Sequence, residues 1–185
     1  MYEKNVDPNG GWEGKPMSML AGINLSQFVK AEGYEPDRCV SRAEWVALMA
    51  RSLGVLRGAD KPGSGAAPGE PYDDAVNAVV RAGLGRGFPG VQDDPSLPIT
   101  RAETAVLLID MLAAAGVEAQ AVERTDRAPD ERAIPDWARD AAEKAWRLGF
   151  CGGETGGGFR PHDPLTLEEA AAALFRLLRG IGAVD

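Results

Sequence analysis

The sequence is poor in the side chains that most catalytic and metal sites require. It has one histidine, His162, and two cysteines, Cys39 and Cys151, among 185 residues. His162 has no second histidine or cysteine at the spacing of metal ligands, and no nucleophile–base pair can be assembled around it. The two cysteines lie far apart, which leaves open a disulfide or two ordinary thiols. We therefore predict a non-enzymatic protein without a metal or cofactor.

Positive charge and long apolar runs are also scarce. Lys and Arg number 20 against 28 Asp and Glu, for a net charge of −8. No basic cluster offsets this excess, so we expect no nucleic-acid partner. No run approaches the roughly 20 apolar residues of a membrane span, so we expect no membrane insertion. Residues 1–14 are polar and lack the apolar core of a secretory signal. This favours either a processed piece of a secreted protein or a protein that is never secreted.

One short pattern occurs three times in the chain. In each copy a Ser or Thr is followed three positions later by Glu, and a run of apolar residues at helical spacing begins there. Such a pair forms a capping box, in which the hydroxyl and the carboxylate each accept a backbone N–H of the first helical turn. The pattern predicts three helix starts. The tetrapeptides are Ser41-Arg42-Ala43-Glu44, Thr100-Arg101-Ala102-Glu103 and Thr166-Leu167-Glu168-Glu169.

A second apolar run precedes two of these starts. One opens at Asp136 and stops at Gly149, and the other opens at Asp73 and stops near Gly85; an acid suits the first turn of a helix. Residues 17–30 are a weaker candidate, and Gly54 is expected to end the helix that starts after Ser41. These runs predict an all-α fold of three helix–loop–helix repeats. Their bounds are 17–57, 72–116 and 134–182, after an N-terminal extension at 1–16.

The repeats resemble the S-layer homology family. The third copy has Trp137-Ala138, Leu148-Gly149-Phe150, Phe159-Arg160-Pro161 and Leu165-Thr166, and the second has Gly87-Phe88-Pro89-Gly90 and residues 99–103. The first copy matches least, at residues 34–36 and 40–44. The resemblance implies three repeats around a pseudo-three-fold axis, with grooves between neighbours. It also implies non-covalent anchoring to the bacterial cell envelope through an acidic, often pyruvylated, secondary cell-wall polysaccharide.

The resemblance further implies a ligand-contacting arginine directly after the helix-capping residue. This position holds Arg42 after Ser41 and Arg101 after Thr100, whereas the third copy has Leu167, so at least one groove is expected to be degraded. A cation in the first helical turn lies at the unfavourable end of the helix dipole, which costs about 0.3–1 kcal/mol. We therefore expect a carboxylate near each arginine, supplied either by the ligand or by an internal salt bridge.

The candidate ligand-binding residues are Arg101, Thr100, Arg42, Ser41, Trp137 and Arg160, of which the last two lie in the third copy. Trp137 is expected in the first turn of its helix, where it either packs in the core or offers a face for sugar stacking. A guanidinium such as that of Arg160 matches the planar carboxylate of a pyruvyl group.

The leading prediction is a wall-anchoring module at the cell surface or in an S-layer, with a cell-wall polysaccharide as partner. The alternative is a structural assembly protein, such as a virion or surface-filament component, that uses the same fold for contacts with other subunits. The weak first copy, Leu167 and the polar start favour this alternative. A fragment of a larger surface enzyme, with catalysis elsewhere in the parent chain, is a third reading.

Overall fold

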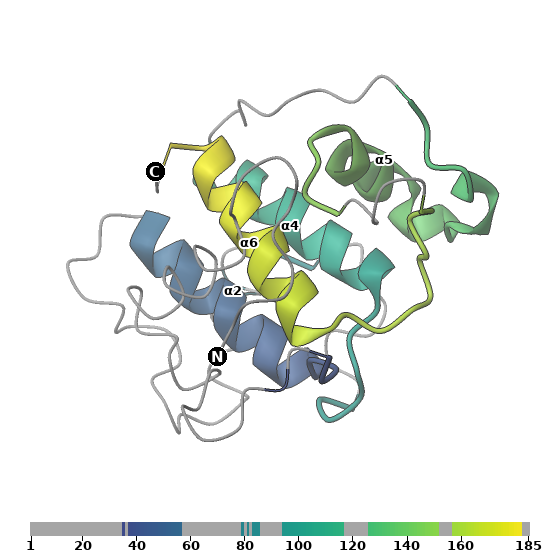
Figure 1. Ribbon diagram of the computed structural model, residues 1–185. Coiled ribbons are helices and arrows are strands. Elements are labelled where there is room, and N and C mark those ends of the chain that lie inside the picture. The colour runs from purple at the N-terminus through teal and green to yellow at the C-terminus, as the bar shows by residue number, and fades with distance from the viewer. Residues whose placement is uncertain are drawn as a thin grey trace, which may run out of the picture.

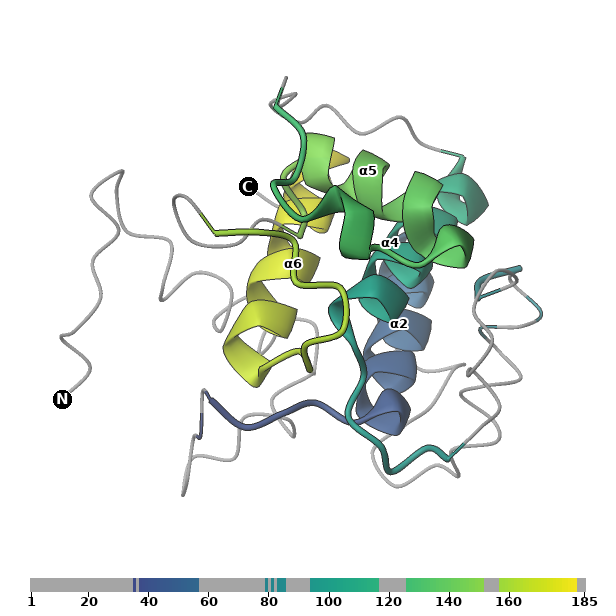
Figure 2. The same cartoon turned by 90° about the vertical axis from the view of Figure 1, so that its right-hand side faces the viewer.

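A computed structural model describes the chain at residues 35, 37–56, 79, 81, 83–85, 94–116, 126–151 and 157–182. The helices there are α2 (Arg42–Leu56), α4 (Arg101–Ala115), α5 (Arg139–Arg147) and α6 (Leu167–Gly180), with short 3-10 helices at Glu131–Ala133 and Asp136–Ala138. Figures 1 and 2 show α2, α4 and α6 side by side, with α5 packed on α4. The all-α prediction is confirmed for these residues.

All three predicted helix starts are present, and each carries its capping box. Thr100 and Thr166 accept from the backbone N–H of Glu103 and Glu169, and each glutamate accepts the N–H of its capping residue in return. Ser41 and Glu44 make the same exchange at the start of α2, at 3.2 and 2.9 Å. The capping residue therefore fixes where each helix begins.

One predicted helix end, at Gly149, is confirmed, and one, at Gly54, is wrong. Gly116 follows α4 and Gly149 follows α5, both in the left-handed conformation that glycine adopts without strain. Gly54 lies inside α2, which continues to Leu56, so the expectation that Gly54 ends this helix is wrong. An internal glycine costs about 1 kcal/mol relative to alanine. The buried contacts of α2, which include Trp45 and Met49, outweigh that cost.

Three short segments before α2, α4 and α6 join in a closed ring of backbone hydrogen bonds. Val40 N–H donates to the Leu165 carbonyl, Leu165 N–H to the Ile99 carbonyl, and Ile99 N–H to the Val40 carbonyl, each at 2.9 Å. All three side chains are buried. Isolated bridges at Cys39–Thr166, Ser41–Pro98 and Thr100–Pro164 flank the ring. Each segment donates once and accepts once, so the ring closes only when all three are in place.

Each helix start also receives a carbonyl from one neighbouring segment. Arg42 N–H donates to Leu97, Arg101 N–H to Asp163, and Leu167 N–H to Arg38. We name these contacts, with the side chains around them, the α2 junction, the α4 junction and the α6 junction. The three junctions are equivalent in their backbone hydrogen bonds.

The predicted repeats also include segments that lie outside this ring. Residues 17–30 and nearly all of 72–82 lie outside the described residues, so the helix–loop–helix bounds of the repeats stay a prediction. The run from Asp136 to Gly149 is helical as predicted, with a 3-10 turn before α5. Among the described residues, no helix is long and apolar enough to cross a membrane.

Replacing Ile99 by alanine tests the ring. Ile99→Ala leaves a cavity at a fully buried position, so the free energy of unfolding should fall by about 2–5 kcal/mol. Leu97→Ala is the matched control, because Leu97 lies two residues away and is 46% exposed; its effect should stay within about 0.5 kcal/mol. Urea unfolding of both variants measures the difference, and equal losses would contradict the assigned role of Ile99.

Candidate functional site

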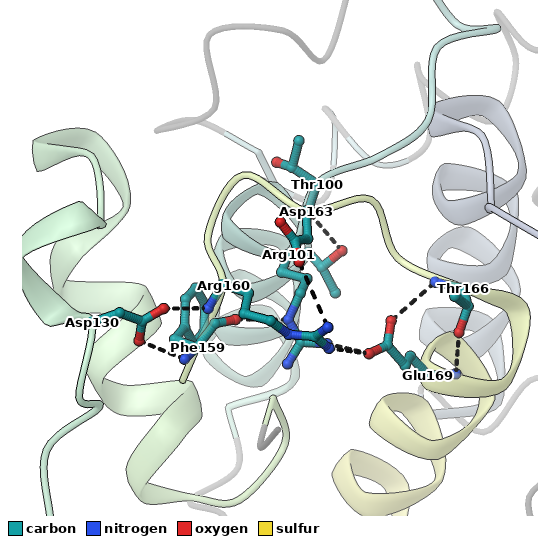
Figure 3. Close-up of polar contacts among 9 residues, drawn as sticks. Thr100, Arg101, Asp130, Phe159, Arg160, Asp163, Thr166 and Glu169 are labelled. Atoms are coloured by element: carbon teal, nitrogen blue, oxygen red, sulfur yellow. Dashed lines mark hydrogen bonds and ion pairs between the residues drawn. The ribbon is translucent and has the colours of Figure 1, made fainter. Parts of the chain in front are cut away.

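The α4 junction contains a buried arginine held by partners from two segments. Arg101 is only 3% exposed; its Nη1 lies 2.7 Å from Glu169 Oε1 on α6, and its Nε donates to the Phe159 carbonyl at 2.7 Å. Figure 3 shows the guanidinium between them. A carboxylate was expected near this cation, and it is supplied by the protein itself. Arg101 therefore ties the start of α4 to α6 and to the loop before it.

A second arginine converges on the same carboxylate oxygen. Arg160 Nη2 lies 2.8 Å from Glu169 Oε1, and Arg160 Nη1 lies 3.6 Å from Asp163 (Figure 3). The Arg160 side chain is 48% exposed. Arg101 Nη2 is buried and has no hydrogen-bond partner among the described residues. An exposed and a buried guanidinium thus share one carboxylate, and a donor is left over.

The loop that carries Arg160 is fixed by Asp130. Its carboxylate accepts the backbone N–H of Phe159 at 2.6 Å and that of Arg160 at 2.7 Å. Arg160 has a φ of 53°, which is uncommon for a residue with a side chain. A Cβ on Gly158 would lie 2.6 Å from the Asp130 carboxylate, so only glycine allows this close approach. Asp130 was not identified from the sequence, because nothing local links it to a loop about 30 residues away.

The α2 junction repeats the buried pair with different surroundings. Arg42 Nη2 lies 2.7 Å from Glu103 Oε1, and their side chains are 14% and 7% exposed. Asp94, on the neighbouring segment, accepts from the Ser96 hydroxyl at 2.6 Å and from its backbone N–H at 2.9 Å. These hydrogen bonds, and the charge of Arg42, lower the pKa of Asp94. The Ser41 and Thr100 hydroxyls both accept helix-capping bonds.

The α6 junction has no arginine in the first turn of its helix. Leu167 occupies that position and is buried, while Arg38 Nη1 lies 2.9 Å from Glu44. The hydrogen bond with Glu44 raises the pKa of Arg38. Burial raises the pKa of Glu44, but its hydrogen bonds with Arg38 and Ser41 outweigh burial and lower it. Glu44 is therefore paired within its own segment, through an arginine that sequence reasoning missed.

The remaining candidates lie in three different environments. Trp137 is 39% exposed, so the core-packing reading is wrong for it, whereas Trp146 is buried and donates to the Asp126 carbonyl at 3.0 Å. Trp146 also lines a cavity of about 410 Å³ beside α5. The residues that line this cavity include both arginines and acids. His162 lies in a turn, 3.1 Å from the Ala133 carbonyl. No group of metal-ligating side chains occurs in the described ranges.

Comparison with known proteins matches one segment of the chain to a family. Residues 129–171 match the family model of the S-layer homology domain. Over 99% of its length the chain is 30% identical to the amylopullulanase of Thermoanaerobacterium thermosulfurigenes, of which it covers 10%. It is 29% identical over 93% of its length to the exoglucanase XynX of Acetivibrio thermocellus, covering 16% of that protein. It is 25% identical over 94% to the surface-layer 125 kDa protein of Lysinibacillus sphaericus, covering 14%. The chain thus spans a small part of each relative.

A methyl group at residue 158 should disturb the loop that holds Arg160. Gly158→Ala drives its Cβ into the Asp130 carboxylate, so the free energy of unfolding should fall by about 1–3 kcal/mol, as for other overpacked sites. In an Asp130→Ala background the same substitution should cost much less, because the obstructing group is gone. A double-mutant cycle in urea measures this coupling, and additive losses would contradict the contact.

The two cysteines are free thiols and should differ in reactivity. Burial raises the pKa of Cys151 to about 11, so at pH 8 nearly all of it is the unreactive thiol, whereas Cys39 is exposed. Iodoacetamide at pH 8 should label Cys39 in the native protein and Cys151 only after denaturation. Peptide mass spectrometry reads out both sites; a cross-linked 39–151 peptide or equal labelling rates would contradict this.

Proposed function

We propose that this chain, a member of the S-layer homology family, attaches to the bacterial cell surface by binding an acidic cell-wall polysaccharide. The observation that carries the proposal is the position of the Arg101–Glu169–Arg160 cluster. The matched segment, 129–171, contains Arg160, Glu169 and the supporting Asp130. The family resemblance implies that the polymer is a secondary wall polysaccharide whose acidic group is a ketal-linked pyruvate.

The relatives support anchoring over catalysis. The three relatives, an amylopullulanase, an exoglucanase and a surface-layer protein, differ in their named roles. Each nevertheless matches nearly the full length of this chain. The shared part is 16% or less of each protein. A module shared by proteins with different roles is better explained by a common place of attachment than by a common catalytic reaction. We infer that catalytic activity belongs to the remainder of the enzymatic relatives.

The cluster offers a physical route for binding a carboxylate. Arg160 is half exposed and can turn its guanidinium to an incoming acid as a bidentate fork. Glu169 then keeps Arg101 as its partner, so the buried arginine does not lose its counter-charge, a loss that would be costly. The unpartnered Nη2 of Arg101 supplies a further donor to an acceptor that enters the junction.

The other candidate residues take supporting roles in this proposal. Ser41 and Thr100 hold the helix starts through their capping bonds. Trp137 presents an exposed aromatic face that could stack on a sugar ring. Arg42 occupies the position of Arg101 in the α2 junction. The proposed set is therefore Arg101 and Arg160 as polar contacts, with Trp137 as an apolar one.

Sedimentation with purified cell walls tests the function and Arg101 together. The chain should sediment with walls that retain their secondary polysaccharide, and should stay in solution with walls stripped of it by hydrofluoric acid or amidated at their carboxyl groups. Arg101→Ala should weaken binding by about 1.5–3 kcal/mol, the range for a charge-assisted hydrogen bond. Arg101→Lys should recover part of this, because an ammonium keeps the charge but not the fork.

Folding of the same variants must be measured, because Arg101 is also a structural residue. Arg101→Ala should lower the melting temperature, since Glu169 and the Phe159 carbonyl lose their donor. Arg127→Ala is the control, at a site whose side chain is 78% exposed. Equal sedimentation with intact and stripped walls would contradict the function, and concentration-dependent self-association in place of wall binding would favour the assembly alternative.

A further inference from the structure

The three junctions share one turn, and its first residue differs in charge. Arg38 N–H donates to the Glu35 carbonyl at 3.1 Å, Leu97 N–H to Asp94 at 3.4 Å, and Asp163 N–H to Arg160 at 3.2 Å. In the sequence a proline follows each of these first residues. The side chains of all three first residues are exposed. Glu35, Asp94 and Arg160 therefore occupy equivalent positions beside the α6, α2 and α4 junctions.

The α2 and α4 junctions each contain one arginine–glutamate pair between two helix starts. Arg42 pairs with Glu103 and Arg101 with Glu169, both at 2.7 Å. In each pair the arginine follows the capping residue of one helix, and the glutamate belongs to the capping box of another. The arginine after the capping residue therefore does not distinguish these junctions. What distinguishes them is the exposed turn residue, which is Asp94 at the α2 junction and Arg160 at the α4 junction.

The exposed charge of the first turn residue is positive at the α4 junction and negative at the other two. At the α4 junction two arginines, 101 and 160, face two carboxylates, those of residues 163 and 169. Among the described residues of the α2 junction, Arg42 pairs with Glu103, and its charge also lowers the pKa of Asp94. In the described part of the α6 junction, Arg38 pairs with Glu44, and the charge of Glu35 also raises the pKa of Arg38. At the α4 junction the first residue of the turn is an exposed cation, Arg160, which pairs with the exposed Asp163. At the α2 and α6 junctions the first residue of the turn is an exposed anion.

We propose that the α4 junction alone among the three binds the acidic polysaccharide, and that the first residue of the turn decides which junction binds. This inference rests on the proposed function. It goes beyond the expectation that Leu167 disables one groove, because the α2 junction keeps Arg42 and is still closed to acids. A carboxylate that approached Arg42 would lie beside Asp94, and like charges in one site repel. The selectivity lies in the loop and not in the helix.

Changing the turn residues should move the binding site. The probe is a short fragment of purified secondary wall polysaccharide with one carboxylate per molecule, titrated calorimetrically at low salt. The wild-type chain should bind one fragment. Arg160→Glu should weaken binding about 10- to 100-fold, as expected for loss of a charge-assisted contact, and Arg160→Gln should weaken it less. Asp94→Arg should add a second site, so that the chain binds two fragments.

Matched variants separate charge from structure. Arg127→Glu makes the same charge reversal at a side chain that is 78% exposed, and it should leave fragment binding unchanged. Asp94→Asn keeps an acceptor for Ser96 while removing the charge, so it should admit weak binding at the α2 junction without loosening the turn. The melting temperature should stay near that of the wild-type chain for Arg127→Glu and Asp94→Asn. It should fall modestly for Arg160→Glu, which loses its ion pairs with Glu169 and Asp163, and for Asp94→Arg, which loses the hydrogen bonds from Ser96.

The outcomes distinguish this inference from the function on which it rests. Two or three sites on the wild-type chain, unchanged binding by the folded Arg160→Glu variant, or a single site on the folded Asp94→Arg variant would each overturn the inference while the anchoring function stands. If the wild-type chain binds neither the fragment nor intact walls, the proposed function fails and the inference fails with it.

Discussion

The ring of three backbone hydrogen bonds at Val40, Ile99 and Leu165 is the constraint on which the rest of the structure depends. These groups are buried, and a buried N–H or carbonyl without a partner is costly. Each segment can satisfy its neighbours only if the other two are present. The ring thereby fixes the starts of α2, α4 and α6 relative to one another, and Arg42 and Arg101 take their positions from helix starts that the ring has placed.

The ion pairs follow from this arrangement. Arg42 and Arg101 each reach the capping glutamate of the next helix, so one carboxylate caps its own helix and neutralises its neighbour's cation. Such partly buried pairs add little net stability, but they penalise any arrangement that separates them. At the α6 junction Leu167 removes the crossing pair, and Arg38 compensates by pairing with Glu44 from the same segment. Among the described residues, the ring, the hydrogen bond from the Leu167 N–H to the Arg38 carbonyl and the buried apolar side chains then hold that junction.

The sequence predicts the local part of this structure and misses the part that depends on distant partners. The capping boxes, the three helix starts and the end of α5 at Gly149 were predictable, because their hydrogen bonds join residues a few positions apart. Arg101 and Glu169 are 68 residues apart, and no pattern within the chain pairs them. Asp130 and Arg38 carry no motif. Gly54 misled because a local signal for helix termination was outweighed by burial of the helix.

At the junctions, the residues that hold the fold together differ from the turn residues that are proposed to select a ligand. The capping residues, the ring and the buried arginines cannot change without disturbing several segments at once, since each has partners on two of them. The first residue of each turn contributes its backbone carbonyl to that framework. Its side chain is exposed and makes local contacts, as between Asp94 and Ser96 and between Arg160 and Glu169. Glu35, Asp94 and Arg160 can therefore differ in charge while the backbone hydrogen bonds of the three junctions stay the same. If the proposed function holds, a junction can in this way gain or lose affinity for an acidic polymer through one exposed side chain while the fold is kept.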